Sequence, residues 1–142
     1  MEIGLGVRII YQDSDVVEVR VCAWNGRFGG ATDAYIGTGE LQEAAMKLQG
    51  FPKGRTDTRE IVFGAFGPDS AGGGVRVRVY CTDAAVHISA QVEIESEYDE
   101  AGTFESVTLL LPIEVAALDS FVTELGRLGA GQEKAFLTAG LT

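Results

Sequence analysis

The amino-acid sequence predicts an α+β protein in which one antiparallel sheet of about seven strands, in the order βββ-α-ββββ-α, carries two helices packed on one face. Several segments alternate apolar and polar residues, which is the period of a strand with one buried face. Two other segments place their apolar residues at the period of a helix, and glycine-rich turns separate the segments. The predicted strands cover approximately residues 3–11, 15–24, 27–36, 61–65, 75–82, 86–95 and 107–111.

Turn residues set the expected strand pairing. Asn25-Gly26 stands between two strand patterns, and this dipeptide favours a type I′ hairpin turn because both central positions need positive φ. Such a turn places Trp24 opposite Arg27, close enough for a cation–π contact. A second turn, at Asp83-Ala84, is expected to join the fifth and sixth strands.

Both helices are predicted from single apolar stripes, so each should cover the sheet with one face. The first helix spans about residues 38–49, with Thr38 as its N-cap. The second helix begins at Pro112, because a missing N–H has no intrahelical partner in the first turn. Residues 130–142 form a C-terminal tail that packs on the domain or on a partner.

Length and composition indicate a single domain over residues 1–142. A chain of this length buries roughly two-thirds of its unfolded surface, and 46% hydrophobic with 23% charged residues is an ordinary globular composition. No apolar run reaches the length of a membrane span and no basic leader is visible, so a cytoplasmic protein without membrane contacts is expected. Cys22 and Cys81 fall on opposite strand faces, so they are not expected to pair.

The search for catalytic chemistry finds no constellation. His87 is the single histidine, and no nucleophile is spaced around it. Histidine and cysteine are too few for a metal site, so neither a metal nor a cofactor is expected. The glycines of residues 37–39 suit a helix start, and those of residues 72–74 lack the Gly-Lys-Ser/Thr of a phosphate loop. The sequence therefore predicts that the protein is not an enzyme.

Negative charge is concentrated in the last third of the chain. Residues 93–142 carry a net charge of −8 out of the total of −10, and no Lys or Arg occurs between Arg78 and Arg127. Such a one-sided field attracts cationic partners and repels nucleic acid. The expected partner is therefore another protein, of basic character, and not a nucleic acid.

Several turn and strand segments carry a resemblance to a group of uncharacterised bacterial α+β proteins, over about residues 14–128. These are residues 25–28, 35–37, 50–52, 72–76 and 81–83, with Leu41. The resemblance implies no activity and no functional residue. In its fold and acidity the chain also looks like the immunity proteins of bacterial toxin systems, which implies a protein partner.

The sequence thus predicts a non-enzymatic protein-binding module, an immunity-like inhibitor of a basic partner. A homo-oligomeric structural protein that buries its outer sheet face and tail is an alternative, and a small-molecule-binding protein is another. The residues expected to bind the partner are the acids Glu93, Glu95, Glu97, Asp99 and Glu100, with Trp24, Tyr35 and Tyr80 as aromatic anchors.

Overall fold

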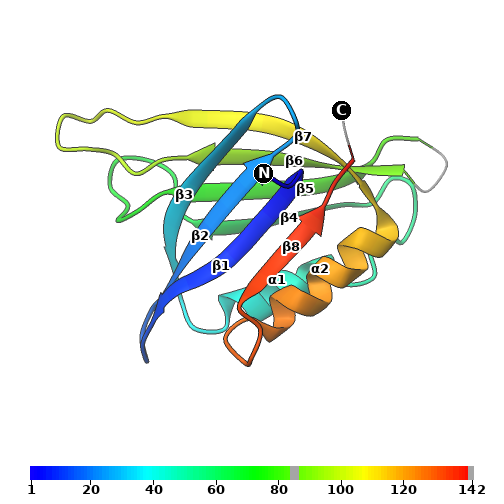
Figure 1. The fold of residues 1–142 in the computed structure, drawn as a ribbon, viewed down its shortest axis with the longest axis horizontal. Helices are drawn as coiled ribbons and strands as arrows, with labels where there is room; N and C mark the ends of the chain where they lie inside the picture. The colour runs from blue at the N-terminus through cyan, green and yellow to red at the C-terminus, as the bar shows by residue number, and fades with distance from the viewer. Residues whose placement is uncertain (84–86, 141–142) are drawn as a thin grey trace.

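The computed structural model, which describes residues 1–83 and 87–140, contains eight strands in two four-stranded antiparallel sheets, together with two helices (Figure 1). Sheet A has the order β3-β2-β1-β8. Its strands are β1 (Gly4–Gln12), β2 (Val17–Trp24), β3 (Gly29–Ile36) and β8 (Lys134–Thr138). The α+β class is therefore confirmed, but the expectation of a single seven-stranded sheet is wrong.

Sheet B contains the strands from the middle of the chain, in the order β4-β5-β6-β7. The two helices separate the sheets along the chain, because α1 lies between β3 and β4 and α2 lies between β7 and β8. The bounds of these elements are β4 (Thr58–Gly64), β5 (Gly74–Cys81), β6 (His87–Glu95), β7 (Ser106–Glu114), α1 (Glu40–Leu48) and α2 (Val115–Arg127).

The buried face of each sheet covers the buried face of the other. Val7 and Val21 of sheet A and Val79 and Val92 of sheet B are all fully buried. A period-two pattern shows that one face of a strand is buried, but it does not show whether helices or another sheet cover that face. Sheet-on-sheet packing therefore gives the same sequence pattern as the single helix-covered sheet that the sequence suggested.

The two sheets come closest along β3, which contacts all four strands of sheet B. The N–H of Gly73 donates to the Asp33 carbonyl of β3 at 2.8 Å, and Ala34 of β3 forms a bridge with Gly72. In Figure 1 the strands of sheet A run obliquely across those of sheet B. The sheets are therefore joined by main-chain hydrogen bonds at this corner, in addition to side-chain packing.

Small residues make this close approach possible. A Cβ atom on Gly73 would overlap both the Thr32 hydroxyl and the Glu95 carbonyl, and one on Gly30 would lie 2.8 Å from a methyl of Val107. Real Cβ atoms essentially never approach other atoms so closely. Glycine is needed at Gly73 because a neighbouring backbone occupies the place of a side chain.

The helices close the opposite side of the sandwich. α2 packs on β8 and on α1, and α1 packs on β4, so the helices connect the outer edge of one sheet to the outer edge of the other (Figure 1). Leu118, Phe121 and Leu125 of α2 are completely buried. The apolar stripes read from the sequence therefore face the core, as expected, although they fill the space between two sheet edges.

Two helix starts differ from the sequence-based expectation. The N-cap of α1 is Gly39, with φ of 88°, and not Thr38. Pro112 lies within β7, and α2 begins three residues later, after Glu114. Proline is tolerated there because β7 is an edge strand and the missing N–H would point away from β6.

The hairpin after β2 is longer than a two-residue turn. Trp24 pairs with Gly29 rather than lying opposite Arg27. The side-chain oxygen of Asn25 accepts N–H bonds from Arg27 at 2.9 Å and from Phe28 at 2.7 Å, which stabilises a wider turn. The turn expected at Asp83-Ala84 lies partly outside the described residues.

The C-terminal tail contributes a strand to sheet A. β8 pairs with β1, placing Leu137 opposite Leu5 and Phe136 opposite Gly6. The carboxylate of Glu124 on α2 accepts the N–H of Phe136 at 2.9 Å. This main-chain donor of the edge strand is therefore already occupied within the domain.

We expect Gly73→Ala to lower the free energy of unfolding by about 3 kcal/mol, the upper end of what overpacking a core costs, because the new methyl group would overlap the Thr32 hydroxyl of β3 and the Glu95 carbonyl of β6. The matched control is Gly54→Ala, where a Cβ has nothing within 4 Å; it should change stability by less than about 0.5 kcal/mol. Urea unfolding followed by Trp24 fluorescence measures both. Equal stability of the two variants would contradict the close approach of the sheets.

Candidate functional site

The acids expected to bind a partner are divided between a strand and the loop that follows it. Glu93 and Glu95 lie on β6, whereas Glu97, Asp99 and Glu100 lie in the loop between β6 and β7. We call this loop, residues 96–105, the acidic tip. Figure 1 shows it in yellow and yellow-green, extending beyond the ends of both sheets at the left of the view. The acidic tip is therefore the most prominent part of the acidic region.

The two strand acids are engaged in contacts within sheet B. Glu93 accepts a hydrogen bond from the Arg76 guanidinium at 2.5 Å, and Arg76 also lies 3.6 Å from Glu60. Glu95 accepts the backbone N–H of Gly67 at 2.9 Å. These two carboxylates hold neighbouring strands and a loop in place, so they are poorer binding groups than the acids of the tip.

Asp99 organises the acidic tip. Its side-chain oxygen accepts the N–H groups of Ala101 at 2.9 Å and of Thr103 at 2.8 Å. At the base of the tip, the hydroxyl of Ser96 accepts the N–H of Glu105 at 2.8 Å. A carboxylate that accepts two backbone N–H bonds is the usual device for fixing a tight turn. Asp99 therefore has a structural role.

The remaining acids of the tip are accessible to solvent. Glu97, Glu100 and Glu105 are all exposed. Beside them the Tyr98 and Phe104 rings stack with their centroids 4.3 Å apart, and Phe104 remains 43% exposed. Contact between the two rings stabilises the closed form of the loop. The tip therefore combines a braced loop with three exposed acids and one partly exposed aromatic ring.

Of the three predicted aromatic anchors, Tyr35 on β3 is placed beside acids. Its phenol is 43% exposed. The charge of Glu18 raises its pKa above the ordinary value of 10.0, and partial burial, a hydrogen bond with Glu18 and the charges of Glu97 and Asp33 raise it further. The Tyr35 ring also lies against Gly72, and the next residue, Gly73, lies against the Glu95 carbonyl at the end of β6, so Tyr35 is close to the base of the acidic tip.

The other two anchors lie elsewhere. Trp24 is at the opposite end of β2, paired with Gly29, whereas Tyr35 pairs with Glu18 near the start of that strand. Tyr80 lies on the outer face of sheet B beneath the Arg78 guanidinium, which is 5.0 Å from the ring centroid. The sequence could not separate these positions, because it assigned all outer-face residues to one sheet.

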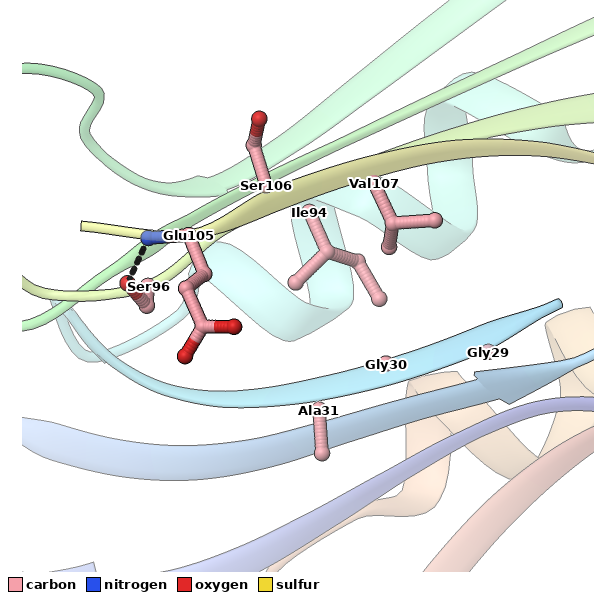
Figure 2. Close-up of a pocket in the computed structure, with 8 residues that line it drawn as sticks. All are labelled: Gly29, Gly30, Ala31, Ile94, Ser96, Glu105, Ser106 and Val107. Carbon is pink, nitrogen blue, oxygen red and sulfur yellow. Dashed lines mark hydrogen bonds between the residues drawn. The ribbon is translucent and has the colours of Figure 1, made fainter.

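A cleft that the sequence did not reveal lies next to the acidic tip, between β3 and the strands β6 and β7. Its volume is about 280 Å³. Figure 2 shows Ile94, Val107 and the Glu105 carboxylate directed toward β3, whereas the Ser106 side chain points away. The lining residues are Gly29, Gly30, Ala31, Ile94, Ser96, Glu105, Ser106 and Val107. The signal that could have indicated it is the run of small residues at the start of an edge strand.

Among the described residues around His87, the two neighbouring hydroxyls are engaged with main-chain carbonyls. The His87 imidazole lies 3.1 Å from the Asp83 carboxylate, and both side chains are more than half exposed. The hydroxyls of Thr82 and Ser89 donate to the main-chain carbonyls of His87 and Leu111, at 3.2 Å and 3.3 Å. Neither hydroxyl is therefore aligned for proton transfer to the imidazole.

Metal binding and membrane crossing were considered for the part of the chain that the structure describes. Among the described residues, no three His, Cys, Asp or Glu side chains gather where they could hold a metal ion. Neither α1 nor α2, the two helices of the described chain, has the length and apolar character that a membrane crossing requires. Cys22 and Cys81 are both free thiols, as expected.

No protein family, curated protein or solved structure was found to match this chain. Its function must therefore be inferred from the geometry and charge of the tip, the cleft and the residues around them.

We expect Glu18→Gln to lower the pKa of Tyr35, because the charge of Glu18 is the largest cause of its elevation. The Tyr35 curve is obtained as the difference between the ultraviolet titrations of the wild-type chain and of a Tyr35→Phe variant. The same difference is then measured with Glu18→Gln present in both chains. As a control, Asp13→Asn should leave the Tyr35 curve unchanged, since Asp13 acts on Tyr11 instead. An unaltered Tyr35 curve in Glu18→Gln would show that the two side chains are not neighbours.

The raised pKa of Tyr35 also makes the stability of the fold depend on pH. A phenol whose pKa is raised by folding binds its proton more tightly in the folded state than in the unfolded state. Its contribution to stability is therefore complete below the ordinary pKa of 10.0 and is lost as the pH rises through the higher folded value. Tyr35→Phe should remove this part of the alkaline loss of stability, as measured by urea unfolding at a series of pH values.

Proposed function

We propose that the protein is a non-enzymatic protein-binding module, immunity-like in character, which binds a basic partner through the acidic tip and the adjoining part of β3. The observation that carries this proposal is the braced, projecting tip, in which Glu97, Glu100 and Glu105 are exposed. No Lys or Arg occurs anywhere between Arg78 and Arg127 to neutralise it.

Electrostatics would act mainly on the rate of association. Charges grouped on a projection attract an oppositely charged partner before contact, and such steering weakens as salt screens the field. Exposed ion pairs add little affinity by themselves, typically below about 1 kcal/mol each. The acids therefore favour a basic partner and orient it, while other contacts hold it.

Two exposed aromatic residues are suited to hold the partner. Tyr35 and Phe104 are each 43% exposed and lie on β3 and in the acidic tip. Aromatic residues with a partly exposed ring are frequent anchors of protein interfaces, because they bury a large area with little loss of side-chain freedom. Acids around such anchors favour lysine and arginine on the partner.

The alternative of a homo-oligomer that buries its outer sheet face and C-terminal tail has less support. The tail is already used within the domain, because it forms β8, which pairs with β1. Its apolar residues Ala135 and Leu137 are fully buried in the core, so they are not free to pack against a second copy. A small-molecule site between sheet and helices is a weaker candidate. A hollow of about 660 Å³ lies where β6, β7, the first turn of α2 and the end of β8 meet, but the His87 and Asp83 side chains that line it are more than half exposed.

The test compares two variants of equal net charge as baits for proteins in a lysate of the source cells. The tip variant carries Glu97→Gln, Glu100→Gln and Glu105→Gln. The control variant carries Glu43→Gln, Asp119→Asn and Glu133→Gln, all exposed acids outside the tip. We expect the wild-type chain and the control to retain a basic protein, identified by mass spectrometry, that the tip variant binds at least about tenfold more weakly at low salt.

Two results would contradict the proposal. Equal retention by the tip and control variants would show that the position of the charge is unimportant. An association rate with the retained protein that does not change with salt would remove electrostatic steering, whatever the affinity.

A further inference from the structure

The N-terminal half of β3 has one open edge. Asn25 donates its N–H to the Phe28 carbonyl within the hairpin, so even-numbered residues of β3 face β2 and odd-numbered residues face outward. The outward bond of Asp33 to Gly73 agrees with this alternation. Gly29 and Ala31 therefore direct their main-chain groups toward the cleft, and no group within residues 1–83 and 87–140 bonds to those of Ala31.

β7 presents a second open edge across the cleft. The N–H of Ser96 donates to the Glu105 carbonyl, so odd-numbered residues of β7 face β6 and even-numbered residues face outward. Pro112 fits this alternation, because its outward carbonyl accepts the Gly140 N–H at 2.9 Å. Ser106 and Thr108 consequently direct main-chain groups away from β6, beside the cleft.

The cleft is suited to an extended chain. Gly30 lets the Val107 side chain approach β3, because a Cβ there would lie 2.8 Å from a Val107 methyl, and the cleft lies beside this contact. Ile94 and Val107 provide apolar surface between the two edges (Figure 2). Among the described residues that line the cleft, Glu105 carries a charge, and its carboxylate is directed toward β3. Main-chain donors and acceptors, with one acid beside them, match an extended segment that carries a basic side chain.

We propose that this cleft binds an extended, lysine- or arginine-bearing segment of the partner, which adds to the open edge of β3 at Gly29 and Ala31. The partner's main chain would bond to the N–H and C=O of Ala31, and a basic side chain would meet Glu105. This inference rests on the proposed function, since it specifies how the basic partner is held next to the acidic tip. Strand addition of this kind takes its affinity from main-chain hydrogen bonds and its selectivity from neighbouring side chains.

The probe is a capped synthetic peptide of alternating valine and lysine, followed by amide NMR of the full chain. Two matched peptides serve as controls, one with glutamate in place of lysine and one with alternate backbone amides N-methylated. We expect the lysine peptide to shift the amide signals of Ala31 and Thr108, and both controls to bind at least about tenfold more weakly. The loss of one to two hydrogen bonds accounts for a change of that size.

Ala31→Pro tests the edge from the protein side. It removes the outward N–H without breaking a bond to β2, and Ala31→Ser is its matched control. We expect Ala31→Pro to weaken binding of the lysine peptide about tenfold, and Ala31→Ser to leave it unchanged. Glu105→Gln, which keeps the β7 backbone intact, should weaken binding of the lysine peptide and not that of a neutral valine–threonine peptide.

Several results would overturn the cleft assignment. If Ala31→Pro and N-methylation leave binding unchanged while the tip variant weakens it, the cleft is not the site but the proposed function stands. If lysine and glutamate peptides bind equally, the cleft assignment and the proposed basic partner both fail. The cleft assignment would also be overturned if the peptide shifted only amide signals on the outer faces of the sheets. A dimer of the free chain that Ala31→Pro dissociates would show that the occupant is a second copy.

Discussion

The close approach of β3 to sheet B is the contact on which the rest of the structure depends. Gly73 bonds to Asp33 across this corner, and its missing side chain leaves room for Thr32 and the Glu95 carbonyl. Because the sheets meet along β3, their far edges diverge, and α1 and α2 fill the space between β4 and β8. A chain with larger residues at the corner could not bring the sheets together there and bury the same helix faces.

The same corner sets the position of the candidate site. β6 and β7 continue past β3 into residues 96–105. Tyr35 on β3 lies against Gly72, close to the end of β6 and therefore to the base of the acidic tip. The approach of Gly30 to Val107 bounds one end of the cleft, whereas Ser96 and Glu105 bound the other. One packing constraint therefore places an acidic projection, an exposed aromatic residue and two open strand edges next to each other.

Local features of the fold could be predicted from the sequence, whereas the arrangement of its sheets could not. The helical spacing of the apolar residues Leu118, Phe121 and Leu125 identified α2. The alternation of apolar and polar residues identified the strands from β1 to β7. Alternation does not say what covers a strand, so two sheets were taken for one. Pro112 suited both a helix start and an edge strand, and the pairing of β7 decided between them. The cleft depends on where β3 crosses β7, a long-range contact that leaves no local signal.

The central claim is that a partner is held at the tip and along the open edge of β3. Hydrogen–deuterium exchange of the complex with the retained partner tests it most directly, since exchange reports protection of main-chain amides along the whole chain. The account predicts that protection gained on binding is concentrated in residues 29–35 and 96–108. Protection confined to the outer face of sheet B, around Arg78 and Tyr80, would contradict it.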